Sequence, residues 1–281
     1  MVHQISNHFL VIKPSVKHAE LLVEYTQLIR KLKSKNISFV ELPKIVDSLS
    51  QRYLCSKDWI TFHGNGGVVV YPMSTLKRQQ ERSDLVFDIL EEKKYVISDV
   101  FDFTEAEEEG FFLEGAGSVV LDRVNNVAYA SISKLTDEEL FIEFCEELEC
   151  TPVVFNSELS EGTEIAHTSS ILTCAKDFVI IGSGLIKDKK ERKLVTLQLK
   201  KSGRELIYIS ESQVNCHVAE IKQVINSSGA SIIVLSKSVL ENLTDAQRTT
   251  LEKYGELLVI DYNKTEKWGA YSIGSVLNDI F

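Results

Sequence analysis

Residues 118–155 read SVVLDRVNNVAYASISKLTDEELFIEFCEELECTPVVF and contain one complete unit of a repeat. Two apolar runs, at 118–121 and 127–130, are separated by DRVNN, a polar stretch of the kind that joins the strands of a hairpin. Apolar residues then recur with helical spacing over 136–149, with Thr136 as the expected N-cap and Glu139 completing a capping box. A further apolar run follows at 152–155. The unit is therefore predicted to be a hairpin, a helix and a third strand.

The same order recurs along the chain, with units beginning near residues 59, 118, 171, 217 and 275. The last unit stops after its start, whereas the N-terminal segment offers only a strand, a helix and a strand, at 9–12, 16–34 and 37–42. Together these two parts complete a fifth unit. We therefore expect a closed ring, which removes most exposed sheet edges. The predicted fold class is α/β, a five-bladed α/β propeller formed by one domain over residues 1–281; a mixed-sheet α/β domain is the alternative.

Some expected elements lie between these units or depend on weaker patterns. The first complete unit is predicted to carry one long amphipathic helix over 76–94 and a strand over 95–100. A strand is expected at 218–224, and a weak helical pattern covers 45–53.

Composition excludes several classes of protein. The net charge is −10, which argues against a nucleic-acid partner because such a partner calls for a basic face. The five cysteines form no C-x-x-C pair, so neither a zinc site nor a disulfide framework is indicated. No signal-peptide pattern and no apolar run of about 20 residues is present, so we expect no membrane partner and a cytoplasmic location.

One acid lies within an apolar stretch, Glu114 in GFFLEGAGSVVL (110–121). An isolated buried charge is costly, so this carboxylate is expected to have a partner. Gly115 and Gly117 follow it and indicate a tight turn or a close approach of another segment.

The repeat places polar residues at equivalent positions, where the units would converge on a central funnel. Asp58 precedes the first hairpin, and Glu114 and His167 each lie four residues before the next two. Cys216 begins the fourth unit, beside His217, and Ser275 opens the fifth. An acid, a histidine and a nucleophile-type side chain in one pocket favour acid–base or covalent chemistry.

Four runs carry a resemblance to the guanidine-modifying superfamily of amidinotransferases, arginine deiminases and dimethylarginine hydrolases. They are YPMSTLKRQQER (71–82), FFLEGAGSVVLDR (111–123), FCEELECTPVVF (144–155) and HTSSIL (167–172). Within it, the chain is most similar to the citrulline-utilisation hydrolase branch. The resemblance extends from about residue 9 to 281 and implies the five-bladed propeller, or pentein, that the repeat also predicts.

The resemblance also implies roles for individual residues. In that superfamily a cysteine attacks the guanidinium or ureido carbon, a histidine moves protons and an acid orients the histidine. Glu114 matches the orienting acid and His167 the histidine. Asp58 matches a substrate-holding position, and Arg78 and Cys216 complete the predicted substrate-binding set. Counting back from the C-terminal Ile-Phe places Ser275 where the family has its cysteine.

Two functions remain open on this basis. In the first, the protein is a catalytically impaired or repurposed member that binds an arginine-like or citrulline-like amino acid, because Ser275 replaces the nucleophile. In the second, it is an active C–N hydrolase or deiminase that uses Ser275 or another thiol, such as Cys216. Neither requires a metal or an organic cofactor. The sequence leaves enzyme status, the ligand and the oligomeric state open.

Overall fold

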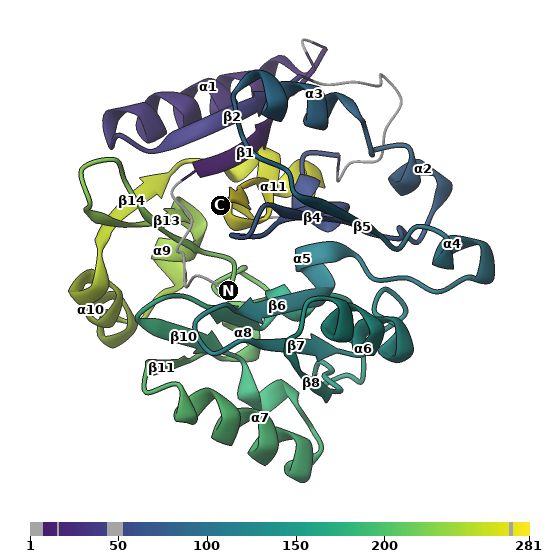
Figure 1. Ribbon diagram of the computed structural model, residues 1–281. Helices are drawn as coiled ribbons and strands as arrows, with labels where there is room; N and C mark the ends of the chain where they lie inside the picture. The colour runs from purple at the N-terminus through teal and green to yellow at the C-terminus, as the bar shows by residue number, and fades with distance from the viewer. Residues whose placement is uncertain (1–7, 16, 44–52, 270–271) are drawn as a thin grey trace.

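Five three-stranded sheets are arranged in a ring in the computed structural model, which describes residues 8–15, 17–43, 53–269 and 272–281 (Figure 1). In each sheet the middle strand runs antiparallel to one neighbour and parallel to the other. In hydrogen-bonded order the sheets are β15 (Asn278–Ile280), β1 (His8–Ile12) and β2 (Ser38–Leu42); β3 (Ile60–Phe62), β4 (Gly67–Val70) and β5 (Asp99–Asp102); β6 (Val119–Asp122), β7 (Val127–Ser131) and β8 (Thr151–Phe155); β9 (Leu172–Cys174), β10 (Phe178–Ile181) and β11 (Glu205–Tyr208); and β12 (Lys222–Ile225), β13 (Ser231–Ser236) and β14 (Glu256–Ile260).

Helices link the parallel strands, because a parallel pair requires a crossover connection. One longer helix serves each sheet: α1 (Ala19–Ser34), α3 (Leu85–Glu92), α6 (Glu138–Glu147), α7 (Lys189–Lys201) and α10 (Asp245–Tyr254). The shorter helices are η1 (Ser56–Asp58), α2 (Leu76–Gln79), α4 (Ala106–Glu109), α5 (Gly115–Ser118), η2 (Thr168–Ser170), η3 (Ser183–Leu185), α8 (Glu211–Val214), α9 (Lys237–Asn242), α11 (Asn263–Gly269) and α12 (Ile273–Val276).

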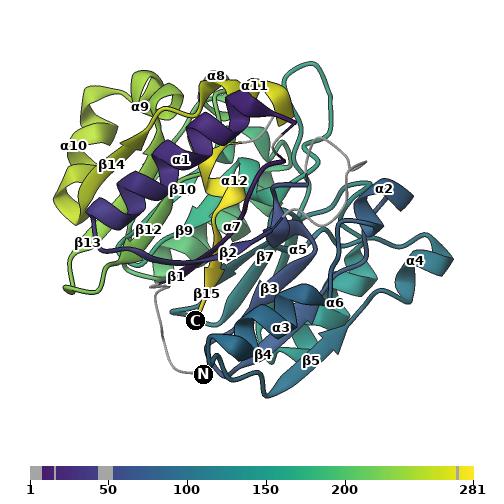
Figure 2. The ribbon, with the colours of Figure 1, turned by 90° about the horizontal axis from the view of Figure 1, so that it is seen from above.

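The ring is closed by strands from opposite ends of the sequence. β15 pairs antiparallel with β1, and Phe9 lies opposite Asp279 (Figure 2). This pair occupies the position that a hairpin fills in the other four sheets. The five-unit ring predicted from the repeat is therefore confirmed.

Buried apolar side chains at helical spacing attach the helices to the sheets. In α1, Leu21, Tyr25, Leu28 and Leu32 are all buried. The charged residues of the helix lie mostly on its other face, as expected for an amphipathic helix. Within the described ranges, no helix has both the length and the apolar character needed to cross a bilayer.

The single helix predicted over 76–94 is wrong. Two helices, α2 and α3, replace it, because local side-chain hydrogen bonds begin each of them separately. Thr75 Oγ1 accepts from the amide of Arg78 at 3.3 Å, and Ser83 Oγ accepts from the amide of Leu85 at 3.2 Å. The following strand, predicted over 95–100, is β5 at Asp99–Asp102.

Two other local predictions also differ from the structure. Asp137, not Thr136, caps α6, and its carboxylate accepts from the amide of Leu140 at 3.0 Å; Thr136 is buried in a bridge to Leu113. The strand expected over 218–224 begins only at Lys222, because the backbone turns at His217, where φ is +58°. The helical pattern at 45–53 falls largely outside the described residues.

Candidate functional site

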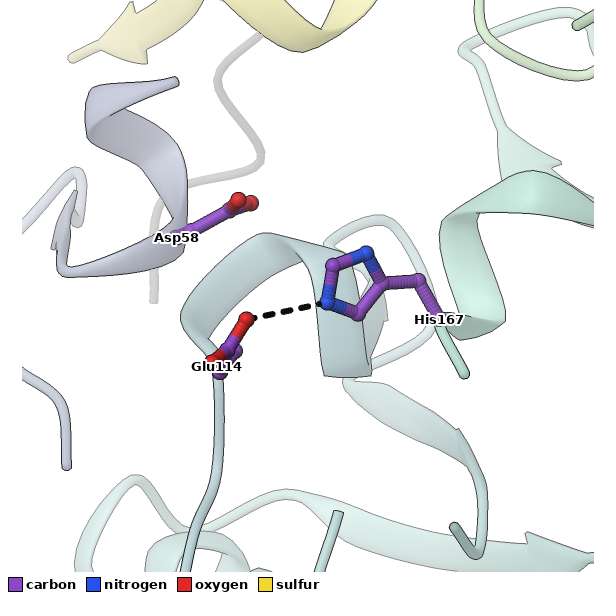
Figure 3. Close-up of side chains that lie close together, drawn as sticks. All are labelled: Asp58, Glu114 and His167. Atoms are coloured by element: carbon purple, nitrogen blue, oxygen red, sulfur yellow. Dashed lines mark hydrogen bonds and ion pairs between the residues drawn. The ribbon is translucent and has the colours of Figure 1, made fainter. Parts of the chain in front are cut away.

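Glu114 and His167 lie in contact, each at the start of a short helix. Glu114 precedes α5 and is 2% exposed, and His167 precedes η2. His167 Nε2 lies 3.2 Å from Glu114 Oε2 (Figure 3). The other carboxylate oxygen accepts from Ser74 Oγ at 2.7 Å and from the Ser74 amide at 3.3 Å. The carboxylate is therefore held from both sides, and the partner expected from the sequence is present.

These contacts keep Glu114 ionised. Burial by itself would raise the pKa of this carboxyl, but the hydrogen bond to His167 and the charge of Arg78 outweigh burial and lower the pKa to about 2. An ionised acid beside an imidazole fixes its orientation and stabilises its protonated form.

The two glycines after Glu114 allow α5 and η1 to pack backbone against backbone. Gly115 has φ +42°, and a Cβ there would lie 2.3 Å from the carbonyl oxygen of Lys57. A Cβ on Gly117 would lie 3.0 Å from Asp58 Oδ1 and 3.2 Å from the His167 ring. The close approach predicted from these glycines is thus confirmed, and it brings Asp58 to the other two side chains.

Arg78 joins the carboxylates of this group. Its Nη2 lies 2.8 Å from Asp58 Oδ2 and 3.6 Å from Glu114 Oε2, and its Nη1 lies 3.0 Å from Glu81 Oε2. All four side chains are buried. Three carboxylates thus surround one guanidinium beside His167.

Asp58, Glu114 and His167 have the spacing of a metal site. One ligand atom from each lies within 4.8 Å of the others. Arg78, however, forms ion pairs with both carboxylates, so a second cation in this place would be repelled by its guanidinium. The donor set therefore fits an ion-pair network with Arg78 better than a metal ion, and the expectation that no metal is needed stays a prediction.

Ser275 belongs to a neighbouring cluster centred on Glu220. Its hydroxyl donates to Glu220 Oε2, which also accepts from Ser272 Oγ at 3.2 Å. His217 Nδ1 lies 2.9 Å from the other carboxylate oxygen. In the described part of the chain, Ser275 forms no hydrogen bond with His167.

Sequence reasoning missed Glu220, although the signal was available. In HVAEI the acid stands within an apolar run, as Glu114 does in GFFLEG. Burial alone would raise its pKa, but the hydrogen bond and charge of His217, with Lys57 and Ser275, lower it to about 2. Gly274 packs against it so closely that a Cβ would lie 2.2 Å from the Glu220 carbonyl oxygen.

Lys57 lies between the two clusters. It is buried, and its Nζ contacts Ser169 Oγ at 3.2 Å and the Ala116 carbonyl at 3.5 Å. Burial lowers the pKa of this amine. Lys57, Glu220 and Gly274 also line a cavity of about 170 Å³, whose other walls come from β6, β9, β12 and β15.

Cys216 follows α8 and packs against the apolar cluster around β9, β10 and β13. Its sulfur is not part of the Asp58, Glu114 and His167 group, which includes no cysteine among the described residues. The structure thus brings together Asp58, Arg78, Glu114 and His167, and places Ser275 in the Glu220 cluster. The roles assigned to all six residues stay predictions.

Several solved structures share the fold. The chain superimposes on the apo structure of ArgZ, an arginine dihydrolase of the ornithine–ammonia cycle in Cyanobacteria. The TM-score is 0.73 and the identity 12%, and the match covers 97% of this chain and 39% of that chain. For the N-terminal domain of ArgZ, solved as a mutant bound to substrate, the TM-score is 0.72 and the sequence identity 11%. That match covers 97% of this chain and 98% of the ArgZ domain. For a dimethylarginine dimethylaminohydrolase adduct the TM-score is 0.68 and the sequence identity 12%. That match covers 98% of this chain and 100% of the aminohydrolase chain.

The chain thus spans well under half the length of the ArgZ apo structure, but nearly all of the ArgZ N-terminal domain and all of the aminohydrolase. No curated protein sequence matches it significantly. The family model described as "N,N dimethylarginine dimethylhydrolase, eukaryotic" matches residues 4–281. Since that match covers nearly the whole chain, and the five-sheet ring is that of the arginine dihydrolases and of the aminohydrolase, this chain belongs to the eukaryotic dimethylarginine dimethylhydrolase family of the guanidine-modifying pentein superfamily.

Proposed function

We propose that this protein binds a small amino acid carrying a guanidino or ureido group beside Glu114, His167 and Asp58, and that it does not turn this ligand over by cysteine chemistry. The observation that carries the proposal is the bonding of Ser275, whose hydroxyl donates to Glu220. A serine becomes a nucleophile only when a base accepts its proton. A carboxylate whose pKa is about 2 is too weak a base for that task.

The charges around His167 support a cationic ligand. Asp58, Glu81 and Glu114 place three buried carboxylates close to His167 and around Arg78. A guanidinium would be attracted by these carboxylates and would donate several hydrogen bonds to their oxygens. A neutral ureido group would depend on hydrogen bonds alone, so we expect it to bind more weakly.

Structural relatives show that such binding survives the loss of a cysteine. The N-terminal domain of ArgZ with a cysteine-to-serine change was solved bound to substrate, and AgrE with a cysteine-to-alanine change was solved with L-arginine. If Ser275 stands where these relatives have their cysteine, as the resemblance implies, it is compatible with a ligand-binding role.

An active C–N hydrolase is the second candidate function. The Glu114–His167 pair favours it, because an oriented imidazole is the proton-transfer component of such a reaction. The nucleophile would be Ser275, released from Glu220, or another thiol such as that of Cys216.

Turnover and binding assays separate the two candidates. The purified protein is incubated with arginine, methylated arginines, agmatine and citrulline, and ammonia, citrulline and ornithine are measured. We expect no product, together with a rise in melting temperature for at least one ligand, since a ligand that binds only the folded state stabilises it. Product formation would overturn the binding proposal, and neither product nor stabilisation would count against both functions.

Ser275→Cys tests whether only the nucleophile is missing, and Ser272→Cys is its matched control. Both hydroxyls donate to Glu220, but only Ser275 stands at the position that the resemblance gives to the family cysteine. We expect hydrolysis in Ser275→Cys and none in Ser272→Cys. Equal inactivity of both variants, despite ligand binding, would show that the pocket has lost more than the thiol.

A further inference from the structure

Three helices of the ring end in the same backbone motif before their outer strands. After α1, α3 and α6 a residue with positive φ ends the helix: Asn36 at +53°, Lys94 at +63° and Glu149 at +52°. The next amide then donates to a carbonyl five residues back, at 2.9–3.0 Å: Ile37 to Leu32, Tyr95 to Leu90, and Cys150 to Cys145. This is the Schellman motif, which brings the two side chains of that pair into contact.

The paired side chains differ between the units in one respect. After α1 and α3 they are apolar, Leu32 with Ile37 and Leu90 with Tyr95, and they pack into one core cluster. After α6 the contact is made by two thiols, those of Cys145 and Cys150. Apolar residues satisfy the motif equally well, so packing alone does not require a cysteine at either position.

We propose that Cys145 and Cys150 form a thiol pair that peroxide oxidises to a reversible intramolecular disulfide. The motif fixes both backbone segments, and its hydrogen bond of 2.9 Å holds the pair together. Cys145 is 2% exposed and Cys150 is half-buried, so Cys150 is the thiol that a small oxidant can reach.

The interaction between the two side chains makes Cys150 the more acidic of the two thiols. The hydrogen bond from Cys145 lowers the pKa of the Cys150 thiol, and the charge of Arg123 contributes to the same effect. The same hydrogen bond, with burial, raises the pKa of Cys145. The thiolate is the nucleophile in sulfur oxidation, so Cys150 reacts first.

The reaction balances with hydrogen peroxide as the only oxidant. The Cys150 thiolate attacks one peroxide oxygen, an S–O bond forms, the O–O bond breaks, and the departing hydroxide is protonated to water. The Cys145 sulfur then attacks the Cys150 sulfur, forming the S–S bond and breaking the S–O bond, and its proton leaves with the second hydroxide as water. Two thiols lose two electrons, and one peroxide becomes two waters.

Peptide mapping of the full chain tests the proposal. The reduced protein is treated with hydrogen peroxide and digested without reductant by a protease that cuts after glutamate. Three glutamates between the two cysteines, at 146, 147 and 149, let the protease separate them. We expect the two peptides to remain linked after peroxide and to separate after dithiothreitol. Cys216, which is also half-buried, is expected to stay outside any disulfide.

Variants test the order of the two steps. In Cys145→Ser the Cys150 sulfenic acid has no resolving thiol, so labelling by dimedone should exceed that of the wild type by about tenfold or more. Cys145→Leu with Cys150→Ile reproduces the apolar pair that follows α1, and should keep the melting temperature within a few degrees while losing the linkage. Absence of the linked peptides under conditions that label Cys150 in Cys145→Ser would overturn the proposal. So would direct oxidation of wild-type Cys150 to a sulfinic acid.

Discussion

Glu220→Gln removes one negative charge from a buried side chain while keeping its size. Glu220 accepts hydrogen bonds from Ser272 and Ser275, contacts His217, and lies near the charge of Lys57. Burial by itself would raise its pKa, but these partners lower it from 4.5 to about 2. We expect Glu220→Gln to lower the free energy of unfolding in a way that depends on pH.

The size of the effect follows from the linkage between pKa and stability. At about 1.4 kcal/mol per pKa unit, a carboxyl that changes from 4.5 unfolded to about 2 folded contributes about 3 kcal/mol at pH 7. Because the folded pKa is the lower one, this contribution is complete above pH 4.5 and is lost as the pH falls toward 2. At pH 3 about 1 kcal/mol of it remains.

Urea unfolding at pH 7 and pH 3 measures this difference. The gap between the wild type and Glu220→Gln should narrow from about 3 to about 1 kcal/mol between the two pH values. Glu241→Gln is the control, because Glu241 forms an exposed pair with Lys237 at 3.8 Å and should change stability by less than about 1 kcal/mol. The reasoning fails if Glu220→Gln matches the wild type at pH 7, or if the gap is as wide at pH 3.

Three further substitutions are checked by the same urea measurement. Gly115→Ala should lower the free energy of unfolding by more than about 2 kcal/mol, because φ at this position is +42° and the new Cβ would collide with a backbone oxygen. Gly184→Ala is its control and should lower it by less than about 0.5 kcal/mol, because no atom lies within 4 Å of the new Cβ. Arg78→Met should cost about 3–5 kcal/mol, because it removes a cation that pairs with three buried carboxylates, and an unchanged midpoint would contradict that network. Glu24→Ala should lower the free energy of unfolding by about 2–4 kcal/mol, because the buried carboxylate accepts hydrogen bonds from two amides and a hydroxyl at the start of α11. Glu20→Ala, at an exposed position of the same helix, should change it by less than about 0.5 kcal/mol, and equal effects of the two variants would refute this reasoning.

The ring could be predicted from the sequence because its signals are local. Each unit repeats a hairpin, a helix and a strand, and the incomplete units at the two ends of the sequence complement each other. Hydrophobic periodicity finds such elements without any knowledge of long-range contacts. Errors arose at the helix starts. Within 76–94, Ser83 accepts a hydrogen bond from the first residue of a separate helix, α3, and Asp137 rather than Thr136 caps α6.

The candidate site was predictable only in part. Glu114 and His167 stand in recognisable motifs, so their contact could be anticipated. The partner of Ser275 could not, because Glu220 lies 55 residues away in another unit. Nothing in the sequence around Ser275 indicates which acid the fold will bring to its hydroxyl. The buried position of Glu220 within HVAEI marks it as needing a partner, but only the packing of α12 decides which one.

The pairing of β15 with β1 has a consequence for how the protein is made. β1 emerges from the ribosome early, but its antiparallel partner is among the residues synthesised after all five long helices. The sheet of β1 and β2 therefore lacks its third strand, and one edge of β1 stays unpaired, at a stage when the other four sheets can already form. The segment that completes this sheet, from Ser272 to Ile280, also carries the two serine hydroxyls that donate hydrogen bonds to Glu220. Completion of the ring and assembly of this end of the site are thus a single late event in biosynthesis.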